Sequence, residues 1–315
     1  MFNYTKAQIA DIAKRNSFIT NTTEKVLRLY DILEYINQSD INEMLALKGG
    51  TAINLCLLDL PRLSVDIDFD FTVNCDLNKM VEYREIISKT IKDYMQDEGY
   101  LLSNRSKFTH SLDSYAYQYS TLSNSRDVIK IEINYSNRAH VLDPVVTSSS
   151  KVLDKTINIR RLANEELIGS KINALLVRTT PRDVYDVYNL INKKLISNDK
   201  LVREIALFYM CLGKEKPIDI ENIVKESCIK MQKLDYNIAR QTLVPVLHKK
   251  EKIVIENVAA NVIDFVSSLS ILDDKETQFI QEFNKNRYLP ELLFGKEISN
   301  NIINHPMALW KVHNE

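Results

Sequence analysis

Glycine and proline are scarce in this chain, which has 6 Gly and 7 Pro among 315 residues. Such a low content of both argues against disorder and for a helix-rich fold. Cysteine is rarer still, and no two cysteines form a Cys-x-x-Cys pair; the four are Cys56, Cys75, Cys211 and Cys228. This spacing predicts neither a zinc site nor a disulfide framework, and we expect reduced thiols in a cytoplasmic protein.

Long apolar runs are absent as well. No stretch reaches the roughly 20 apolar residues of a membrane-spanning helix. The N-terminal sequence MFNYTKAQIADIAKR lacks the apolar segment of a signal peptide. We therefore expect a cytoplasmic location and no membrane partner. The Gly-rich sequence of a P-loop is also missing, so a nucleotide would need a different kind of phosphate site.

The chain has no excess of positive charge. Its net charge is −1, from 41 basic and 42 acidic residues, whereas a dedicated duplex-binding protein is usually basic. Any binding of RNA would therefore use a local patch, although a solvated surface is the simpler interpretation of each patch alone. The candidate patches are Arg105/Lys107, Arg160/Arg161 and Lys249/Lys250/Lys252.

The most informative stretch covers residues 47–71, LKGGTAINLCLLDLPRLSVDIDFDF. It starts with a tight turn, Lys48-Gly49-Gly50-Thr51, which opens a short apolar helical run. Residues 65–71 then alternate strictly between apolar and acidic side chains, the period of a strand with one face on a core. The other face therefore carries three carboxylates, those of Asp66, Asp68 and Asp70.

Three like charges on one strand face repel each other unless a positive charge lies among them. Residues two apart on a strand project in parallel, so Asp66 and Asp68 can hold the same cation. A site made only of oxygen atoms suits Mg²⁺. The paired glycines upstream let the backbone and a helix N-terminus approach a phosphate closely. The stretch thus predicts a site for a Mg²⁺-bound nucleotide.

This order of a glycine turn, a spacer and a strand Asp-x-Asp resembles the polymerase-β type of nucleotidyltransferase. The fuller pattern resembles the AbiEii/AbiGii nucleotidyltransferase toxins of type IV toxin–antitoxin and abortive-infection systems. It includes the segment Arg62-Leu63-Ser64-Val65-Asp66-Ile67-Asp68-Phe69 and a later helix pair with Lys171, Arg178, Arg182, Asp183 and Asp186 in the family order. The matching motifs cover roughly residues 45–190.

The resemblance implies a Mg²⁺-dependent toxin that transfers NMP from an NTP to RNA, with a tRNA 3′ end as the expected acceptor, and so arrests growth during phage defence. It implies two Mg²⁺ ions on Asp66, Asp68 and Glu132, and a cognate antitoxin as partner. The expected catalytic residues are Asp66, Asp68, Glu132, Lys171, Asp183 and Asp186. The expected nucleotide-binding residues are Lys48, Gly49, Gly50, Thr51 and Arg182.

Glu132 lies within a second alternating stretch, residues 128–135, with apolar neighbours on both sides. If this strand pairs beside the Asp-x-Asp strand, Glu132 projects toward Asp66 and Asp68 and supplies a third carboxylate. The family more often has Asp at this position. The alternative is that Glu132 and Lys130 lie on a solvated face of the sheet.

Lys171 falls on the apolar stripe of a helix predicted over 165–178. Burying a lysine there is costly without a negative partner. The resemblance gives it a triphosphate contact, and the alternative is that its side chain extends to the edge of the core. Asp183 would also suit the N-terminal turn of the following helix without any catalytic role. With Asp186 it could orient Lys171 or Arg182, or help to deprotonate an acceptor hydroxyl.

The expected fold class is α/β (α+β): a nucleotidyltransferase-type mixed sheet with flanking helices, followed by a mostly helical part. We place a catalytic domain at residues 1–155. A helical domain at 156–315 would contribute Lys171, Asp183 and Asp186 to the active-site cleft and would bind the acceptor. From residue 201 onward the pattern predicts about five helices and no usable motif. A monomer is the default expectation.

Two other functions remain open from the sequence. The chain could be a nucleotidyltransferase that modifies a small molecule or a protein hydroxyl. It could also be a nucleotide-binding regulator without catalysis, although the intact pattern of Gly49, Gly50, Asp66 and Asp68 argues against a decayed site. A metal nuclease could use an Asp-x-Asp strand with a glutamate, but the glycine turn would then have no purpose.

Overall fold

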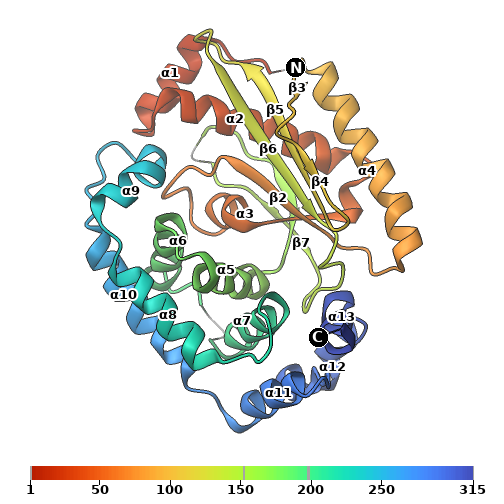
Figure 1. Cartoon of the computed structure of the whole chain (residues 1–315). Helices are drawn as coiled ribbons and strands as arrows, with labels where there is room; N and C mark the ends of the chain where they lie inside the picture. The colour runs from red at the N-terminus through yellow and green to blue at the C-terminus, as the bar shows by residue number, and fades with distance from the viewer. Residues whose placement is uncertain (1, 152, 197–198, 315) are drawn as a thin grey trace. The chain divides into compact units, whose positions relative to one another are not determined.

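A mixed β-sheet forms the centre of the first of two units in the computed structural model, which describes residues 2–151, 153–196 and 199–314 (Figure 1). The first unit comprises Met1–Arg138, Pro144–Leu162 and Pro245–Glu251. The second comprises Ala139–Asp143, Ala163–Val244 and Lys252–Glu315. Two short segments, 139–143 and 245–251, thus belong to the unit opposite to their sequence neighbours. Local periodicity gives no sign of this exchange.

Within the described residues the sheet has eight strands in the order β3-β5-β6-β2-β1-β8-β7, and β4 also pairs with β5. The central strand β2 pairs antiparallel with β1 and parallel with β6. The predicted mixed sheet is therefore confirmed. The strands are β1 Leu45–Lys48, β2 Asp66–Phe71, β3 Leu101–Leu102, β4 Lys107–Phe108, β5 Leu112–Ser120, β6 Arg126–Asn134, β7 Val145–Ser148 and β8 Asn158–Arg161.

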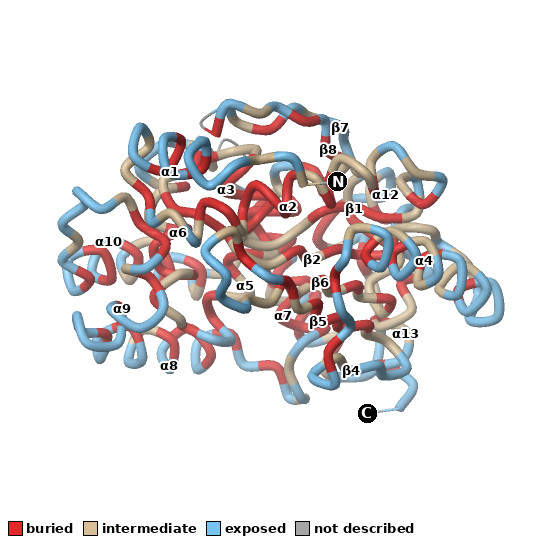
Figure 2. Tube along the Cα trace, turned by 90° about the horizontal axis from the view of Figure 1, so that it is seen from above, coloured by how far each residue is buried: buried red, intermediate tan, exposed pale blue. Residues whose placement is uncertain are grey.

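The apolar positions of the two alternating stretches form the core beneath one face of the sheet. On β2 these are Ile67, Phe69 and Phe71, and all three are buried. On β6 the isoleucines at 129, 131 and 133 are fully buried in the same way. Because side chains alternate between the two faces of a strand, burial of this set directs the acidic set to the opposite face. Figure 2 shows the buried positions gathered on these central strands.

Polar caps start two of the helices of the first unit. Thr5 and Gln8 form a capping box at the start of α1, and the Asp76 side chain accepts a hydrogen bond from Lys79 N at the start of α4. The helical segments are α1 Lys6–Arg15, α2 Thr20–Gln38, the 3₁₀ turn Asn42–Met44, α3 Gly49–Cys56 and α4 Leu77–Asp97.

The second unit is helical throughout its longer segments. After residue 198 it has seven α-helices among the described residues, so the prediction of about five was too low. The helices are α5 Asn164–Arg178, α6 Pro181–Asn192, α7 Asp199–Gly213, α8 Ile220–Gln232, α9 Tyr236–Thr242, α10 Ile255–Ser267, α11 Asp274–Asn284, α12 Glu291–Ile302 and α13 Pro306–Asn314, with 3₁₀ turns at Val244–Val246 and Ser268–Ser270. Several of these helices are short and joined by tight turns. Their sequence patterns therefore run together and predict fewer helices.

In the part of the chain that the structure describes, no single helix is long and apolar enough to cross a membrane. One pair of helical segments, Ile255–Ser270 and Asp274–Asn284, passes the same length and composition test only together, and it is bent by 76°.

A group of charged side chains joins α7 to α11 in the second unit. Glu204 is buried, and burial raises its pKa from 4.5 to about 7. Lys200 and Arg203 on α7 oppose this rise, whereas Glu276 and Asp273 beside α11 add to it. Arg203 Nε lies 2.7 Å from Glu276 Oε1, so this arginine is already committed to the second carboxylate. Glu204 is therefore the acid in this group that burial penalises most clearly.

The sign of this shift predicts a pH dependence of stability. The unfolded chain releases the Glu204 proton near pH 4.5 and the folded chain near pH 7, so the folded state loses stability as pH rises through this window. Glu204→Gln stays neutral, and we expect it to raise Tm by about 2 °C at pH 8 and less at pH 5. Thermal unfolding at both pH values tests this, with the exposed Glu297→Gln as control. An equal gain at both pH values would contradict the assignment.

Candidate active site

The predicted acidic face is built from three adjacent strands. The register of β2 places Asp68 opposite Lys48 on β1 and opposite Glu132 on β6. Asp66 precedes Asp68 by two residues, so its side chain projects from the same face of the sheet. The structure therefore brings together Asp66, Asp68 and Glu132, and it provides the direct pairing of β2 with β6 on which the predicted role of Glu132 depends.

Asp68 lies at the centre of this group, and its surroundings disfavour its charge. Burial raises its pKa from 3.8 to about 6. The neighbouring carboxylates of Asp66 and Glu132 contribute to this rise, while Lys48 and Lys130 oppose it. A carboxylate whose neighbours penalise its charge favours a bound cation, because the cation relieves both repulsion and desolvation. The oxygen donors on this face thus suit a divalent metal such as Mg²⁺.

The three predicted metal ligands do not form a finished metal cage. Glu132 Oε1 lies 2.9 Å from Lys130 Nζ, so its carboxylate is engaged with a neighbour on its own strand. Among the described residues, no group of three or more His, Cys, Asp or Glu side chains has the arrangement of a metal site. Lys130 is 45% exposed, and an exposed ion pair of this kind is weak enough to be exchanged.

Lys48 has a partner that the sequence did not reveal. Its Nζ lies 2.6 Å from Oδ1 of Asp70, the third aspartate of β2. Asp70 is buried, whereas Lys48 is 24% exposed. A buried carboxylate needs such a partner. The predicted contact of Lys48 with a triphosphate would therefore be made by an ammonium group that is already paired with Asp70. Lys48 is also the residue opposite Asp68 in the strand register.

The glycine turn opens α3 directly beside Asp68. Gly49 has φ +70°, a left-handed conformation that favours glycine. A Cβ atom built on Gly49 would lie 2.6 Å from Asp68 Oδ2, so only glycine leaves space for the carboxylate. Lys48, the N-cap residue of α3, forms no side-chain capping bond to the helix. The first N–H groups of the helix, which start at Gly49 and Gly50, thus have no side-chain cap from this residue.

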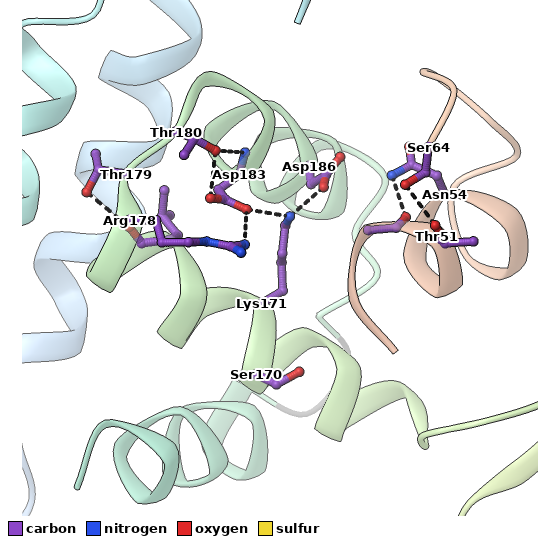
Figure 3. A network of polar contacts seen from close by, with 12 residues as sticks. Thr51, Asn54, Ser64, Ser170, Lys171, Arg178, Thr179, Thr180, Asp183 and Asp186 are labelled. Carbon is purple, nitrogen blue, oxygen red and sulfur yellow. Dashed lines mark hydrogen bonds and ion pairs between the residues drawn. The ribbon is translucent and has the colours of Figure 1, made fainter. Parts of the chain in front are cut away.

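Thr51 differs from the other residues of the turn because its side chain is buried. Its Oγ1 lies 2.9 Å from Ser64 Oγ (Figure 3). The same hydroxyl forms a hydrogen bond with the backbone oxygen of Asp66. The family resemblance predicts a nucleotide contact for Thr51 and no role for Ser64.

In the second unit, Lys171 on α5 lies between two carboxylates of α6. Its Nζ is 2.8 Å from Asp183 Oδ1 and 2.6 Å from Asp186 Oδ2 (Figure 3). The Lys171 side chain is 4% exposed, and those of Asp183 and Asp186 are 3% and 0% exposed. Lys171 thus meets negative partners inside the unit and does not extend to the edge of the core.

The turn between α5 and α6 holds this cluster together. Thr180 caps α6, because its side chain accepts a hydrogen bond from Asp183 N and donates one to Asp183 Oδ2. Arg178 adds a second cation at 2.8 Å from Asp183 Oδ1. Burial alone would raise the pKa of Asp183, but Lys171 and Arg178 hold it well below its usual value. Asp183 is therefore both a helix-start residue and a member of a buried ion cluster.

The remaining predicted residues, Arg182 and those of the basic patches, belong to neither of the two charged groups described above. Arg182 donates from Nε to the backbone oxygen of Thr242, the last residue of α9. Of the three predicted basic patches, Arg160/Arg161 is not a surface patch. Arg161 is buried, and Arg160 donates to the Leu45 carbonyl and to Thr72. The lysines and arginine of the other two patches are exposed.

A cavity in the first unit lies away from the acidic face. It has a volume of about 610 Å³ and lies between α4 and β4–β5. No residue predicted for the active site lines it; the lining residues are Val81, Arg84, Glu85, Ser88, Lys89, Lys92, Asp93, Phe108 and Asp113. Side-chain chemistry, not cavity size, therefore identifies the candidate site.

The buried cluster on α5 and α6 predicts that removal of the Lys171 charge destabilises the protein much more than removal of the Arg178 charge. Lys171→Met leaves Asp183 and Asp186 buried without the ammonium group, and we expect a loss of about 3–5 kcal/mol in the free energy of unfolding. Arg178 is 59% exposed, so Arg178→Met should cost less than about 1 kcal/mol. Urea unfolding of both variants measures the two losses in the free energy of unfolding. Similar small losses would show that the buried ion pairs of Lys171 do not stabilise the fold as described.

Comparisons with known proteins identify the family of this chain. A sequence model described as the nucleotidyl transferase AbiEii toxin of type IV toxin–antitoxin systems matches residues 31–260. A comparison with curated proteins gives no match. Among solved structures, the chain is similar to MenT4, a nucleotidyltransferase toxin from Mycobacterium tuberculosis H37Rv, at a TM-score of 0.65 and 16% identity, over 98% of this chain and 99% of that one.

At this low identity the structural likeness shows the fold. The match to the family model covers well over half of the chain, and it includes the glycine turn, the Asp-x-Asp strand and the Lys171 cluster. The chain therefore belongs to the AbiEii family of nucleotidyltransferase toxins of type IV toxin–antitoxin systems.

Proposed function

We propose that this toxin is a Mg²⁺-dependent enzyme that transfers an NMP group from an NTP to an RNA acceptor, with a tRNA 3′ end as the expected acceptor. One observation carries the proposal. The glycine turn at the start of α3 packs directly against the carboxylate of Asp68, in the middle of the acidic face of β2. A site for phosphate and a site for a cation therefore adjoin, as a metal-bound triphosphate requires.

Each group at this site has a chemical task in the proposed reaction. The N–H groups at the start of α3 would donate to the β- and γ-phosphates. Asp66 and Asp68 would hold Mg²⁺, with Glu132 as a third ligand once it is released from Lys130. When bound, Mg²⁺ supplies positive charge to the attacking and leaving oxygens. Lys48, held by Asp70, would add positive charge beside the triphosphate.

In the reaction the acceptor hydroxyl oxygen forms a bond to the α-phosphorus, and the bond from that phosphorus to pyrophosphate breaks. The proton of the hydroxyl passes to solvent water, and Glu132 would favour its loss by its negative charge. The arrangement leaves an NMP group on the acceptor. On a tRNA 3′ end this group blocks aminoacylation chemistry at the terminal ribose, which accounts for the growth arrest expected of a toxin.

For the second unit we propose fewer specific roles than for the first. We keep residues 1–155 as the proposed catalytic domain and 156–315 as the proposed helical domain for the acceptor. A triphosphate contact by Lys171 stays a prediction, because its ammonium group already meets Asp183 and Asp186. Membership of the family supports a cognate antitoxin as partner, and we propose a cytoplasmic site of action.

A second candidate function is transfer to a small molecule or a protein hydroxyl, and a third is nucleotide binding without catalysis. Incubation with total tRNA, Mg²⁺ and each of four α-³²P-labelled NTPs separates them. Label on tRNA supports the proposal. Label on the protein, or on a small hydroxyl acceptor supplied in a parallel reaction, supports the second function. Saturable NTP binding in a calorimetric titration, without any label transfer, supports the third.

The same assay tests the role of Asp68. We expect Asp68→Asn to reduce label transfer at least about 100-fold. It should also raise Tm or leave it unchanged, because the amide removes a charge that burial disfavours. Asp97→Asn, at the exposed end of α4, serves as control. Full transfer by Asp68→Asn would refute the role of this carboxylate.

The glycine turn offers a matched pair of variants. Gly49→Ala and Gly99→Ala both place alanine at a positive φ, +70° and +78°, at a cost of about 1–2 kcal/mol each. Only the Cβ at position 49 meets Asp68, since no atom lies within 4 Å of a Cβ at position 99. We therefore expect similar losses in Tm from both, but loss of label transfer only from Gly49→Ala. Equal activity of the two variants would contradict the close packing proposed here.

A further inference from the structure

The Thr51 hydroxyl is enclosed at a junction of two segments. Thr51 is 1% exposed and Ser64 is 7% exposed. Thr51 lies in the first turn of α3, and Ser64 lies just before β2. The Thr51 hydroxyl contacts the Ser64 hydroxyl at 2.9 Å (Figure 3). It also contacts the backbone oxygen of Asp66. Such burial leaves this side chain little access to a nucleotide.

The direction of these hydrogen bonds follows from the atoms involved. The Asp66 carbonyl can only accept, and a hydroxyl has a single hydrogen. Thr51 is the donor in both contacts, so its single hydrogen is shared between the Asp66 carbonyl and the Ser64 hydroxyl oxygen. The Thr51 hydroxyl thus joins the turn to Ser64 and to the backbone of the first predicted metal ligand. In this arrangement the hydrogen of Thr51 is not available to a phosphate.

A second contact joins the same two segments. Gly49, two residues before Thr51, packs against the carboxylate of Asp68, two residues after Asp66. The turn is thus fixed to the strand at two points, one through packing and one through hydrogen bonds. The two points lie at the two aspartates of the Asp-x-Asp sequence. Their combined effect is to fix the N–H groups of the turn relative to both carboxylates.

We propose that Thr51 and Ser64 are positioning residues, which hold the phosphate-binding turn in register with Asp66 and Asp68. The inference rests on the proposed transferase function. It replaces the nucleotide contact that the family resemblance implies for Thr51. The side chain acts on the reaction through the backbone of Asp66, and Ser64 acts through Thr51.

This role affects the rate of transfer more than nucleotide binding. The N–H groups of the turn still meet the phosphates when the Thr51 hydroxyl is lost, so the KM for the NTP changes little. The carboxylates then lose their fixed position relative to those phosphates. A misplacement of about 1 Å in an active site costs about 100-fold in rate, so kcat carries the effect.

The test uses kcat and KM for NTP in the label-transfer assay. For Thr51→Val we expect a 10- to 100-fold lower kcat with KM within threefold of wild type. Thr51→Ser keeps the hydroxyl and should restore most of kcat. Ser64→Ala should lower kcat less, because the bond from Thr51 to Asp66 remains, and the double variant should be no worse than Thr51→Val.

Thr23→Val is the matched control. Thr23 is also fully buried in the first unit, and its hydroxyl donates to the Ile19 carbonyl within α2 at 3.0 Å. Equal kcat for Thr51→Val and Thr23→Val would overturn the inference. A raised KM with unchanged kcat would also overturn it, because it indicates direct contact with the nucleotide. If Thr51→Val does not fold, the kcat of Thr51→Ser and Ser64→Ala decides the question.

Failure of the proposed function has a different outcome. A folded wild-type protein that transfers no label from any NTP to any acceptor overturns the transferase proposal, and the positioning role with it. An active wild type with an equally active Thr51→Val overturns the positioning role alone.

Discussion

Repulsion among three aspartates on one face of β2 is the constraint on which the rest of the first unit depends. The apolar residues between them are needed in the core, so the acids cannot turn away from each other. The fold resolves part of this repulsion with Lys48, which pairs with the buried Asp70. It leaves Asp68 beside Asp66 and Glu132, and burial together with these two charges raises the pKa of Asp68 to about 6. A bound metal–nucleotide is the natural compensation for that residual charge.

The surroundings of the acidic face keep its geometry fixed. Gly49 leaves only enough space for the Asp68 carboxylate, and Thr51 joins the turn to the backbone of Asp66. In the second unit, Lys171 is enclosed by Asp183 and Asp186 in a cluster that the capped turn before α6 maintains. Both groups place charge in buried positions, where loss of one partner is costly. Strict requirements on residue type follow from this burial.

Much of this arrangement could be predicted from the sequence. Strict alternation gave β2 and β6 and their buried faces, and the family resemblance indicated that Glu132 would lie near Asp68. The place of Asp183 in the N-terminal turn of a helix was also predicted. The pairing of Lys48 with Asp70 was not, because the pattern does not say which of three equivalent carboxylates a lysine on the next strand will meet. That choice depends on strand register, which tertiary packing sets.

Other features depend on burial, which a single sequence does not reveal. Thr51 looked like a residue of a phosphate turn, yet its side chain lies inside the unit. Arg160 and Arg161 looked like a basic patch, yet Arg161 is buried and Arg160 binds the backbone of β1. The short helices after residue 198 merged into fewer predicted ones. In each case the local pattern was real, but neighbours distant in the sequence decided its environment.

The central claim is that the acidic face binds a nucleotide through Mg²⁺. Calorimetric titration of the purified protein with each of the four NTPs, once with Mg²⁺ and once with a chelator, tests it most directly. The account predicts saturable binding of at least one NTP with Mg²⁺ and at least about tenfold weaker binding without it. Equal binding under both conditions, or no binding of any NTP with Mg²⁺, would contradict the account.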